Sequence, residues 1–241
     1  MKEKAPPISP QDLERVAAHA LTLVPDRGPE GVRLGLGSGR AAAAFVRALG
    51  ARVRQGLVVR GVPTSDATAA LAREVGIAVI DVDRTSLELT VDGADEVDPR
   101  LDMIKGYGGA LVRERIVAAA SRRQVILVTP DKMVTRLGAR GRLPVEVIPF
   151  ARPFCERRLE ALGCRPAVRQ ADGRPFVTDN GNLILDCGID PPDDPAAFER
   201  AIRAIPGVVD TGLFLGTADV VLLAEAGTVR VLDRRSPSHA T

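Results

Sequence analysis

The chain has 241 residues, of which 45% are hydrophobic and 27% charged, as expected for a globular protein with a substantial core. Its 33 basic and 31 acidic residues give a net charge of +2, which argues against a nucleic-acid-binding protein. Aromatic residues make up only 3%, so stacking platforms for bases are not expected. No apolar run approaches the ~20 residues of a membrane span, and the N-terminal stretch lacks the apolar segment of a secretory signal.

Few residues are suited to metal binding or nucleophilic catalysis. The two histidines, His19 and His239, leave little material for a Ser-His-Asp triad or a histidine-rich metal site. Cys155, Cys164 and Cys187 form no C-x-x-C pair, and an odd number of cysteines without an export signal indicates reduced thiols that serve in packing. We therefore expect a cytoplasmic protein that uses neither a metal nor a cofactor.

Apolar runs alternate with amphipathic stretches over the first 142 residues. Strands are predicted at Val32–Leu36, Gly56–Val62, Ile77–Val82, Leu87–Val91 and Gln124–Val128. Helices are predicted at Gln11–Leu23, Arg40–Leu49, Ala67–Val75 and Leu111–Ser121. Strands separated by helices predict a doubly wound α/β domain with a mostly parallel sheet, spanning residues 1–142.

The pattern changes near Leu143. Strands are predicted at Val145–Ile148, Ala167–Arg169 and Val208–Leu215, helices at Phe154–Leu162 and Pro195–Ile205, and a hairpin over Phe176–Asp186 around Asn180-Gly181. The order βαββαβ predicts a smaller ferredoxin-like α+β domain at residues 143–215. Residues 216–241 are expected to complete the first domain with strands at Asp219–Ala224 and Thr228–Leu232, followed by a disordered tail over 233–241.

A glycine-containing loop, Gly35-Leu-Gly-Ser-Gly-Arg40, lies between a predicted strand and a predicted helix. Glycines let the backbone approach an anion, and a helix N-terminus presents free N–H groups to it. The G-x-G-x-x-G dinucleotide spacing fails at Ala42, and the next strand carries no acidic residue at its end. We predict a phosphate-binding loop, with a plain tight turn as the alternative.

Three further segments place chemistry-bearing residues after predicted strands. Asp92 and Asp95 flank Gly93-Ala94 and either face a cleft or cap a solvated turn. Lys105 precedes a glycine-rich loop that leads into the helix carrying Glu114, so an ammonium, backbone N–H groups and a carboxylate can converge there. The alternative is that Glu114 is an exposed acid, of the kind favoured near a helix N-terminus. Lys132 follows the predicted strand Gln124–Val128, in a chain where only four of the 33 basic residues are lysines.

Together these segments would bring carboxylates, a lysine and backbone donors to one edge of the sheet. No histidine base, metal cluster or activated nucleophile accompanies them. A carboxylate base next to a cation and N–H donors suits proton transfer beside a carbonyl on a small anionic substrate.

Five motifs, in this order, resemble the type A ribose-5-phosphate isomerases: VDGADEVD, MIKGYGGALVRE, LPVEVIPFA, VTDNGNLILD and AIPGVVDTGLF. The resemblance covers about Leu13 to Leu232. It implies metal-independent interconversion of ribose 5-phosphate and ribulose 5-phosphate in the pentose phosphate pathway, a two-domain fold, and a homodimer or homotetramer. It implies Glu114 as general base, with Asp92, Asp95 and Lys105 in the same site. The implied substrate-contacting residues are Gly37, Ser38, Gly39, Arg40, Ala41, Gly93, Ala94, Gly106, Tyr107, Gly108 and Lys132.

Three departures from the family pattern concern substrate recognition. The usual Gly-Thr-Gly-Ser-Thr loop reads Gly37-Ser-Gly-Arg-Ala41, which removes two hydroxyls and adds an arginine. The usual Lys-Gly-Gly-Gly contains Tyr107, and the first helix offers Glu14 and Arg15 where the family often has a lysine. Two alternatives therefore accompany the isomerase prediction: an isomerase of another sugar or sugar phosphate, and a non-catalytic module that binds sugar phosphates.

Overall fold

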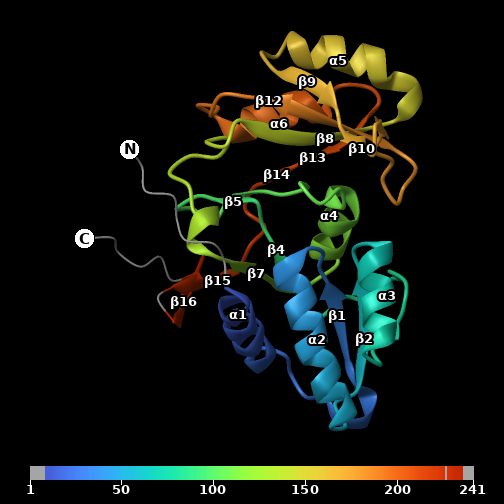
Figure 1. Cartoon of the computed structure of the whole chain (residues 1–241), viewed down its shortest axis with the longest axis vertical. Coiled ribbons are helices and arrows are strands. Elements are labelled where there is room, and N and C mark those ends of the chain that lie inside the picture. Colours follow the sequence, from blue (N-terminus) through green and yellow to red (C-terminus); the bar gives the residue numbers. More distant parts are fainter. Residues whose placement is uncertain (1–8, 226, 236–241) are drawn as a thin grey trace. The chain divides into compact units, whose positions relative to one another are not determined.

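The chain is divided into two compact units. The structure, a computed structural model, describes residues 9–225 and 227–235 (Figure 1). The first unit comprises residues 9–94, Arg113–Met133 and the described residues from Thr217 onward, and the second comprises Asp95–Val112 and Val134–Gly216. The predicted ferredoxin-like domain falls inside the second unit. Residues 95–112 and 134–142, expected in the first domain, belong to the second unit instead.

A seven-stranded sheet forms the centre of the first unit, with the order β16-β15-β7-β4-β1-β2-β3. The neighbouring strands are parallel except for β16, which is antiparallel to β15. The strands are β1 (Val32–Leu36), β2 (Val59–Pro63), β3 (Ala78–Val79), β4 (Leu89–Gly93), β7 (Gln124–Val128), β15 (Val220–Glu225) and β16 (Thr228–Asp233). The helical elements are α1 (Pro10–Thr22), η1 (Gly28–Glu30), α2 (Arg40–Arg54), α3 (Asp66–Glu74), α4 (Leu111–Ala119) and η2 (Pro130–Lys132).

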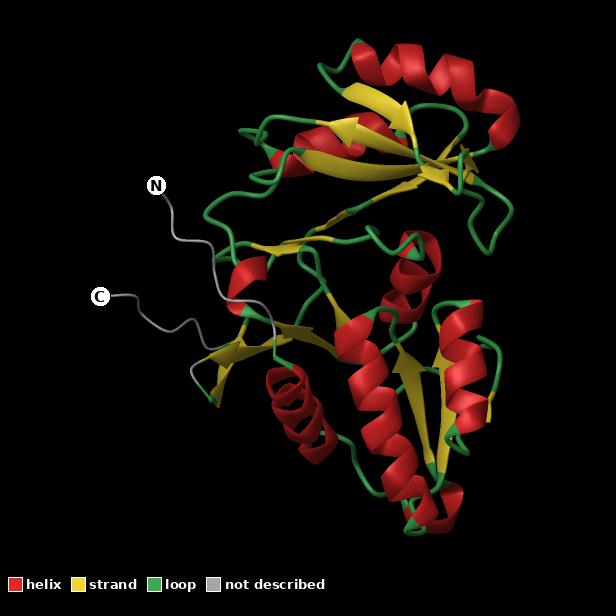
Figure 2. Cartoon of the chain, viewed as in Figure 1, coloured by secondary structure: helices red, strands yellow, loops and turns green. Residues whose placement is uncertain are grey.

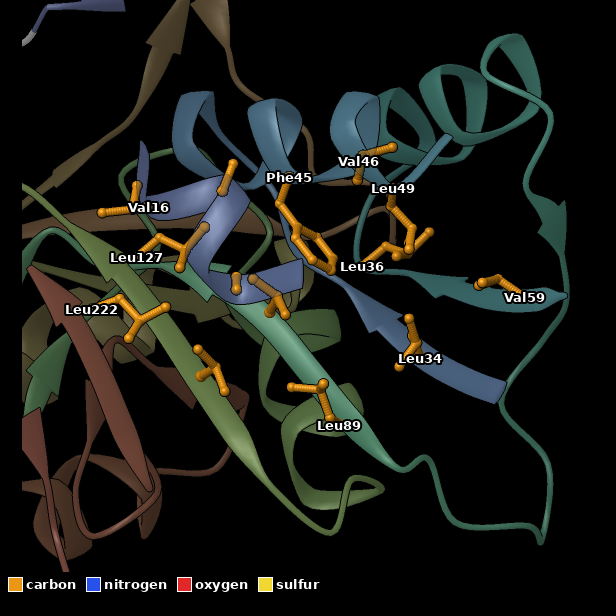
Figure 3. Packing of buried hydrophobic residues seen from close by; sticks show 14 of the residues in the cluster. Val16, Leu34, Leu36, Phe45, Val46, Leu49, Val59, Leu89, Leu127 and Leu222 are labelled. Carbon is orange, nitrogen blue, oxygen red and sulfur yellow. The ribbon is translucent and has the colours of Figure 1, made fainter. Parts of the chain in front are cut away.

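Helices pack against both faces of this sheet. Figure 3 shows the face that is covered by α1 and α2. Phe45 of α2 and Val16 of α1 are fully buried with Leu34 of β1 in the larger core cluster. On the opposite face, Gly35 leaves room for Val117 of α4, because a Cβ at Gly35 would lie 2.5 Å from the valine Cγ1. Successive strand residues point to opposite faces, which explains this alternation. The predicted doubly wound α/β class is confirmed.

The second unit contains a four-stranded antiparallel sheet with the order β13-β8-β12-β9 (Figure 2). Its elements are β8 (Arg142–Val147), η3 (Pro149–Ala151), α5 (Arg152–Glu160), β9 (Arg165–Val168), β12 (Leu183–Gly188), α6 (Pro195–Arg203) and β13 (Val208–Thr211). This order of strands and helices confirms the ferredoxin-like prediction. A smaller three-stranded sheet consists of β5 (Glu96–Val97), β6 (Met103–Ile104) and β14 (Leu213–Phe214).

The hairpin predicted around Asn180-Gly181 forms only in part. Val177 and Leu183 make an isolated bridge, while β12 takes its main partners from β8 and β9. A different hairpin joins β10 (Gln170–Ala171) to β11 (Arg174–Pro175). Its Asp172-Gly173 turn has positive φ at both residues, 51° and 74°, as a type I′ turn requires.

The strand predicted at Val208–Leu215 is interrupted at Gly212. The Gly212 N–H donates to the Pro144 carbonyl of β8, and its carbonyl accepts from the Lys105 N–H beyond β6. A Cβ at Gly212 would lie 2.3 Å from the Lys105 oxygen, so the crossing from one sheet to the other needs glycine.

The first residues of the predicted tail are structured. β16 extends to Asp233, and the Arg234 N–H donates to the Asp219 carbonyl at 2.9 Å. The rest of the predicted tail, residues 236–241 with His239, lies outside the described residues. Across the described ranges, no helix is both long and apolar enough to cross a bilayer.

Candidate functional site

The first unit has a topological switch point between β1 and β4. β2 and β3 lie on one side of β1, whereas β4, β7 and β15 lie on the other. In open α/β sheets, ligands bind at the carboxyl ends of the strands where the order reverses. The loop Gly37–Gly39 follows β1 and Asp92 lies near the end of β4, so two of the predicted segments meet at this point.

Asp92 and the Gly37–Gly39 loop are joined directly. The Asp92 carboxylate is 2% exposed, and its Oδ1 accepts the backbone N–H groups of Ser38 at 3.0 Å and Gly93 at 2.8 Å. A Cβ at Gly37 would lie 2.2 Å from the same oxygen. Glycine at position 37 is therefore a steric requirement of the carboxylate beside it.

Hydroxyl groups gather behind the same loop. Ser38 Oγ lies 2.8 Å from both Thr64 Oγ1 and Ser65 Oγ, and Thr68 Oγ1 donates to the Gly37 carbonyl at 3.0 Å. Ser65 also caps α3 by accepting the Thr68 N–H. Thr64, Ser65 and Thr68 are not among the residues predicted for the site. The signal was the presence of three hydroxyl residues within Thr64–Thr68, the segment that directly follows β2 at the same sheet edge.

Arg40 and Ala41 begin α2 directly after this loop. Arg40 is exposed and lines a groove between α1 and α2 together with Glu14 and Arg47. Within the described residues Arg40 forms no ion pair, so its guanidinium is available to an anion. Ala41 packs against the main core cluster.

Two further predicted site residues, Glu114 and Lys132, belong to helical segments of the first unit. Glu114 is in the first turn of α4 and is 6% exposed. Its neighbour Arg113 pairs with Asp66 at the start of α3, with 2.7 Å between Nη1 and Oδ1. Lys132 ends η2, and its Nζ lies 4.0 Å from Asp131 Oδ2.

Asp95 and the Lys105 loop belong to the second unit, where they are bound to each other. The Asp95 N–H donates to the Ile104 carbonyl at 2.9 Å, and its Oδ2 accepts the Tyr107 N–H at 2.8 Å. Lys105 is 2% exposed, and its ammonium lies 5.6 Å from the centre of the Phe214 ring. A nearly buried ammonium beside an aromatic face is a strong local source of positive charge.

The side chain of Tyr107 is engaged within the second unit. Its hydroxyl donates to the Arg142 carbonyl at 3.1 Å, and the Arg142 guanidinium lies 4.5 Å from the ring centre. Burial, together with the negative charges of Glu96 and Asp95, raises the pKa of Tyr107 to about 12. The phenol therefore stays protonated at neutral pH. Its predicted contact with substrate stays a prediction.

The predicted site residues thus form two groups. The first unit holds Gly37–Ala41, Asp92, Gly93, Ala94, Glu114 and Lys132, and the second holds Asp95, Lys105 and Gly106–Gly108. Among the residues that the structure describes, no group of three or more histidine, cysteine or acidic side chains could hold a metal ion. The three cysteines are free and buried.

Comparisons with known proteins agree on one family. The family model described as ribose 5-phosphate isomerase A (phosphoriboisomerase A) matches residues 60–228. A ribose-5-phosphate isomerase A from Roseiflexus sp. (strain RS-1) is 49% identical over 229 residues, covering 93% of this chain and 96% of the relative.

Solved structures show the same likeness. Ribose 5-phosphate isomerase A from Methanocaldococcus jannaschii has a TM-score of 0.87 at 39% identity and covers 93% of this chain and 100% of that one. A D-ribose-5-phosphate isomerase in complex with phospho-erythronic acid has a TM-score of 0.87 at 34% identity, covering 92% of this chain and 98% of the other.

Proposed function

Because the chain belongs to the ribose 5-phosphate isomerase A family, we propose that it interconverts ribose 5-phosphate and ribulose 5-phosphate with Glu114 as general base. The observation that carries this proposal is the 49% identity to a ribose-5-phosphate isomerase A over nearly the whole chain. The nearly buried Glu114 carboxylate supports it, because the sequence offers no histidine or cysteine in a comparable loop.

The proposed mechanism begins with the open-chain aldehyde of the substrate. The Glu114 carboxylate takes the proton from C2, which leaves an enediolate, and returns it to C1 to form the ketose. Asp92 assists ring opening or the movement of a hydroxyl proton. Asp95 acts in the same site by holding the Tyr107 N–H, as the hydrogen bond at 2.8 Å suggests.

Positive groups stabilise the developing oxyanion in this mechanism. Lys105 supplies a compact ammonium, and the glycine-rich loop after it supplies backbone N–H groups; such stabilisation is usually a large catalytic contribution. The Gly37–Ala41 loop, the N-terminus of α2 and Lys132 are proposed to bind the phosphate.

The direct test is turnover of ribose 5-phosphate by the wild-type protein and by Glu114→Gln. The amide keeps the shape of the side chain but cannot accept the proton, so kcat should fall by about 10²–10⁴-fold while KM changes little. Glu74→Gln, on the exposed end of α3, is the matched control and should retain wild-type kinetics. Activity of Glu114→Gln within about threefold of wild type would remove Glu114 from the mechanism.

A panel of substrates distinguishes the two alternatives. An isomerase of another sugar would turn over a different pentose phosphate, or free ribose, faster than ribose 5-phosphate. A non-catalytic binding module would bind the panel without turnover. Exhaustive treatment with EDTA should leave the rate unchanged, since the proposed chemistry needs no metal.

We further propose a cytoplasmic homodimer or homotetramer. Reduced, buried cysteines suit a reducing compartment, and the family resemblance supports self-association. Light scattering at several protein concentrations would measure the oligomeric state.

A further inference from the structure

Arg169, directly after β9, contacts the backbone of the loop that follows Lys105. Its side chain is 9% exposed, and its Nη1 donates to the carbonyls of Gly106 at 3.0 Å and Tyr107 at 3.1 Å. No motif of the sequence analysis singled out this residue. All the atoms involved belong to the second unit.

Asp186 of β12 holds the other side of the same guanidinium. Arg169 Nε donates to Asp186 Oδ2 at 3.0 Å, and Nη2 donates to Oδ1 at 2.6 Å, which is a bidentate pair. Arg142 binds the same carboxylate through Nε and Nη2, at 2.9 and 3.0 Å. Burial alone would raise the pKa of Asp186, but the hydrogen bonds and charges of the two arginines hold it below its ordinary value.

The geometry of the peptide links these contacts to the direction of the loop's donors. A trans peptide is planar, so its C=O and the following N–H point in opposite directions. With the Gly106 carbonyl bound to Arg169, the Tyr107 N–H points away from Arg169, toward Asp95 Oδ2. With the Tyr107 carbonyl bound as well, the Gly108 N–H also points away from Arg169. That N–H donates to no other described residue, and Gly108 is exposed.

Phe176 supports the end of the same loop. The Gly106 carbonyl also accepts the Gly109 N–H at 3.0 Å, which closes a tight turn. A Cβ at Gly109 would lie 2.6 Å from the Phe176 ring, and the Arg169 guanidinium lies 5.8 Å from the centre of that ring. The backbone of residues 106–109 is thus held by one cation and one aromatic ring.

We propose that Arg169 is a positioning residue for the isomerase reaction: by binding two loop carbonyls, it directs the Gly108 N–H and the adjoining Lys105 toward the oxygens of the substrate. This inference rests on the proposed function of the Lys105 loop. Lysine could not replace Arg169 fully, because a single ammonium cannot span two carboxylate oxygens and two carbonyls at once.

The test compares Arg169→Met with Arg142→Met. Both variants remove one arginine from Asp186, but only Arg169 reaches the loop carbonyls. Arg169→Met should lower kcat about 10–100-fold with KM within about threefold, because misplaced groups lose transition-state stabilisation. Arg142→Met loses its pair with Asp186 and the contact of its guanidinium with the Tyr107 ring but leaves both loop carbonyls bound, so it should lower kcat by at least about fivefold less than Arg169→Met does. Equal losses in the two variants would overturn the proposal.

A double-mutant cycle with Lys105→Met separates positioning from a general loss of stability. If Arg169 acts through the Lys105 loop, the two substitutions should be far from additive, and Arg169→Met should cost little more once Lys105 is gone. If the losses in kcat of the two single variants simply multiply in the double variant, Arg169 acts independently of Lys105 and the proposal is wrong. If Arg169→Met folds poorly, Arg169→Lys serves in its place, with a smaller fall in kcat and the same non-additivity.

Hydrogen exchange of the peptide covering residues 105–112 gives a readout that does not require activity. Exchange should be faster in Arg169→Met than in wild type, and faster than in Arg142→Met, which leaves both loop carbonyls bound. Equal exchange in all three proteins would overturn the proposal even if the enzyme is active. A wild-type protein that turns over no pentose phosphate would instead refute the proposed function, while the exchange result would still decide whether Arg169 holds the loop.

Discussion

The two glycine-containing loops, Gly37–Gly39 in the first unit and Gly106–Gly109 in the second, are held in different ways. The first is held by neutral hydroxyl groups and by backbone N–H donation to the Asp92 carboxylate. The second is held through its carbonyls by Arg169, which is itself paired with Asp186.

The difference lies in where each support comes from. The groups around Gly37 lie at one edge of one sheet, at the ends of strands that pair within it and at the start of α3. The support of the second loop lies 62 and 63 residues away along the chain, between β9 and β10, which belong to two different sheets. One loop therefore depends on sheet topology, hydroxyl groups and a neighbouring carboxylate, and the other depends on a long-range ion pair.

Gly37→Ala should break the first loop at its tightest point. The new Cβ would lie 2.2 Å from Asp92 Oδ1, so either the carboxylate or the loop must move. We expect activity to fall more than about 100-fold and unfolding free energy to fall by about 1–3 kcal/mol. Gly108→Ala meets nothing within 4 Å and should leave the urea midpoint unchanged. Similar urea midpoints for Gly37→Ala and wild type would contradict this prediction.

Acid should weaken the ion pair that holds the second loop. The pKa of Asp186 is lower in the folded protein than its ordinary value, so its contribution to stability is full above about pH 4 and is lost as pH falls through the folded pKa. The stability difference between wild type and Asp186→Asn should be about 1.5–3 kcal/mol near neutrality and should shrink in acid. Thr68→Val removes the hydroxyl of α3 that donates to the Gly37 carbonyl of the first loop, and it should cost about 1 kcal/mol at every pH. Urea unfolding across the pH range measures both, and parallel pH dependences would remove the contrast.

Arg40→Ser sharpens the comparison at the exposed start of α2. If Arg40 binds the substrate phosphate, KM for ribose 5-phosphate should rise severalfold while kcat changes little, as expected when uniform binding is lost. Inhibition by inorganic phosphate should weaken in parallel. An unchanged or lower KM would mean that the hydroxyls and N–H groups of the first loop bind the phosphate without Arg40.

Titration of Tyr107 is the mildest probe, because it changes neither sequence nor activity at neutral pH. The chain has one tyrosine and no tryptophan, so tyrosinate absorbance reports this residue alone. The native protein should titrate near 12 and the urea-unfolded chain near 10, so stability falls as pH rises between these values. A native titration near 10 would mean that the Tyr107 hydroxyl is not held at Arg142.

Long strands with clear boundaries could be predicted from the sequence. Val32–Leu36 and Gln124–Val128 have the same bounds in the structure, because each is an apolar run that ends at residues unsuited to continue it. The two-residue strands β5, β6 and β14 show no period that a sequence pattern could reveal. Their pairing depends on the chain crossing between two sheets at Gly212, which only the tertiary fold specifies.

The contacts that hold the first loop could be predicted from the sequence, whereas those that hold the second loop could not, because they depend on the tertiary fold. Asp92 and Ser38 each follow a predicted strand, so parallel pairing of β1 and β4 is enough to bring them together. Arg169 is one of 33 basic residues, and nothing in its neighbourhood along the chain marks it. Its contact with Gly106 requires the pairing of β9 with β12 and the path of a segment far away, neither of which a local pattern contains.

The chain passes between the two units at residues 94/95, 112/113, 133/134 and 216/217. During synthesis, β7 therefore leaves the ribosome long before β15, which pairs with it in the register Val125 to Val220. Until then the nascent chain carries an apolar central strand with one bare edge, a template for pairing with other chains. The second unit is complete by residue 216, so it can fold first. A chain cut before residue 217 would keep every strand of that unit and lose two from the sheet that carries Asp92.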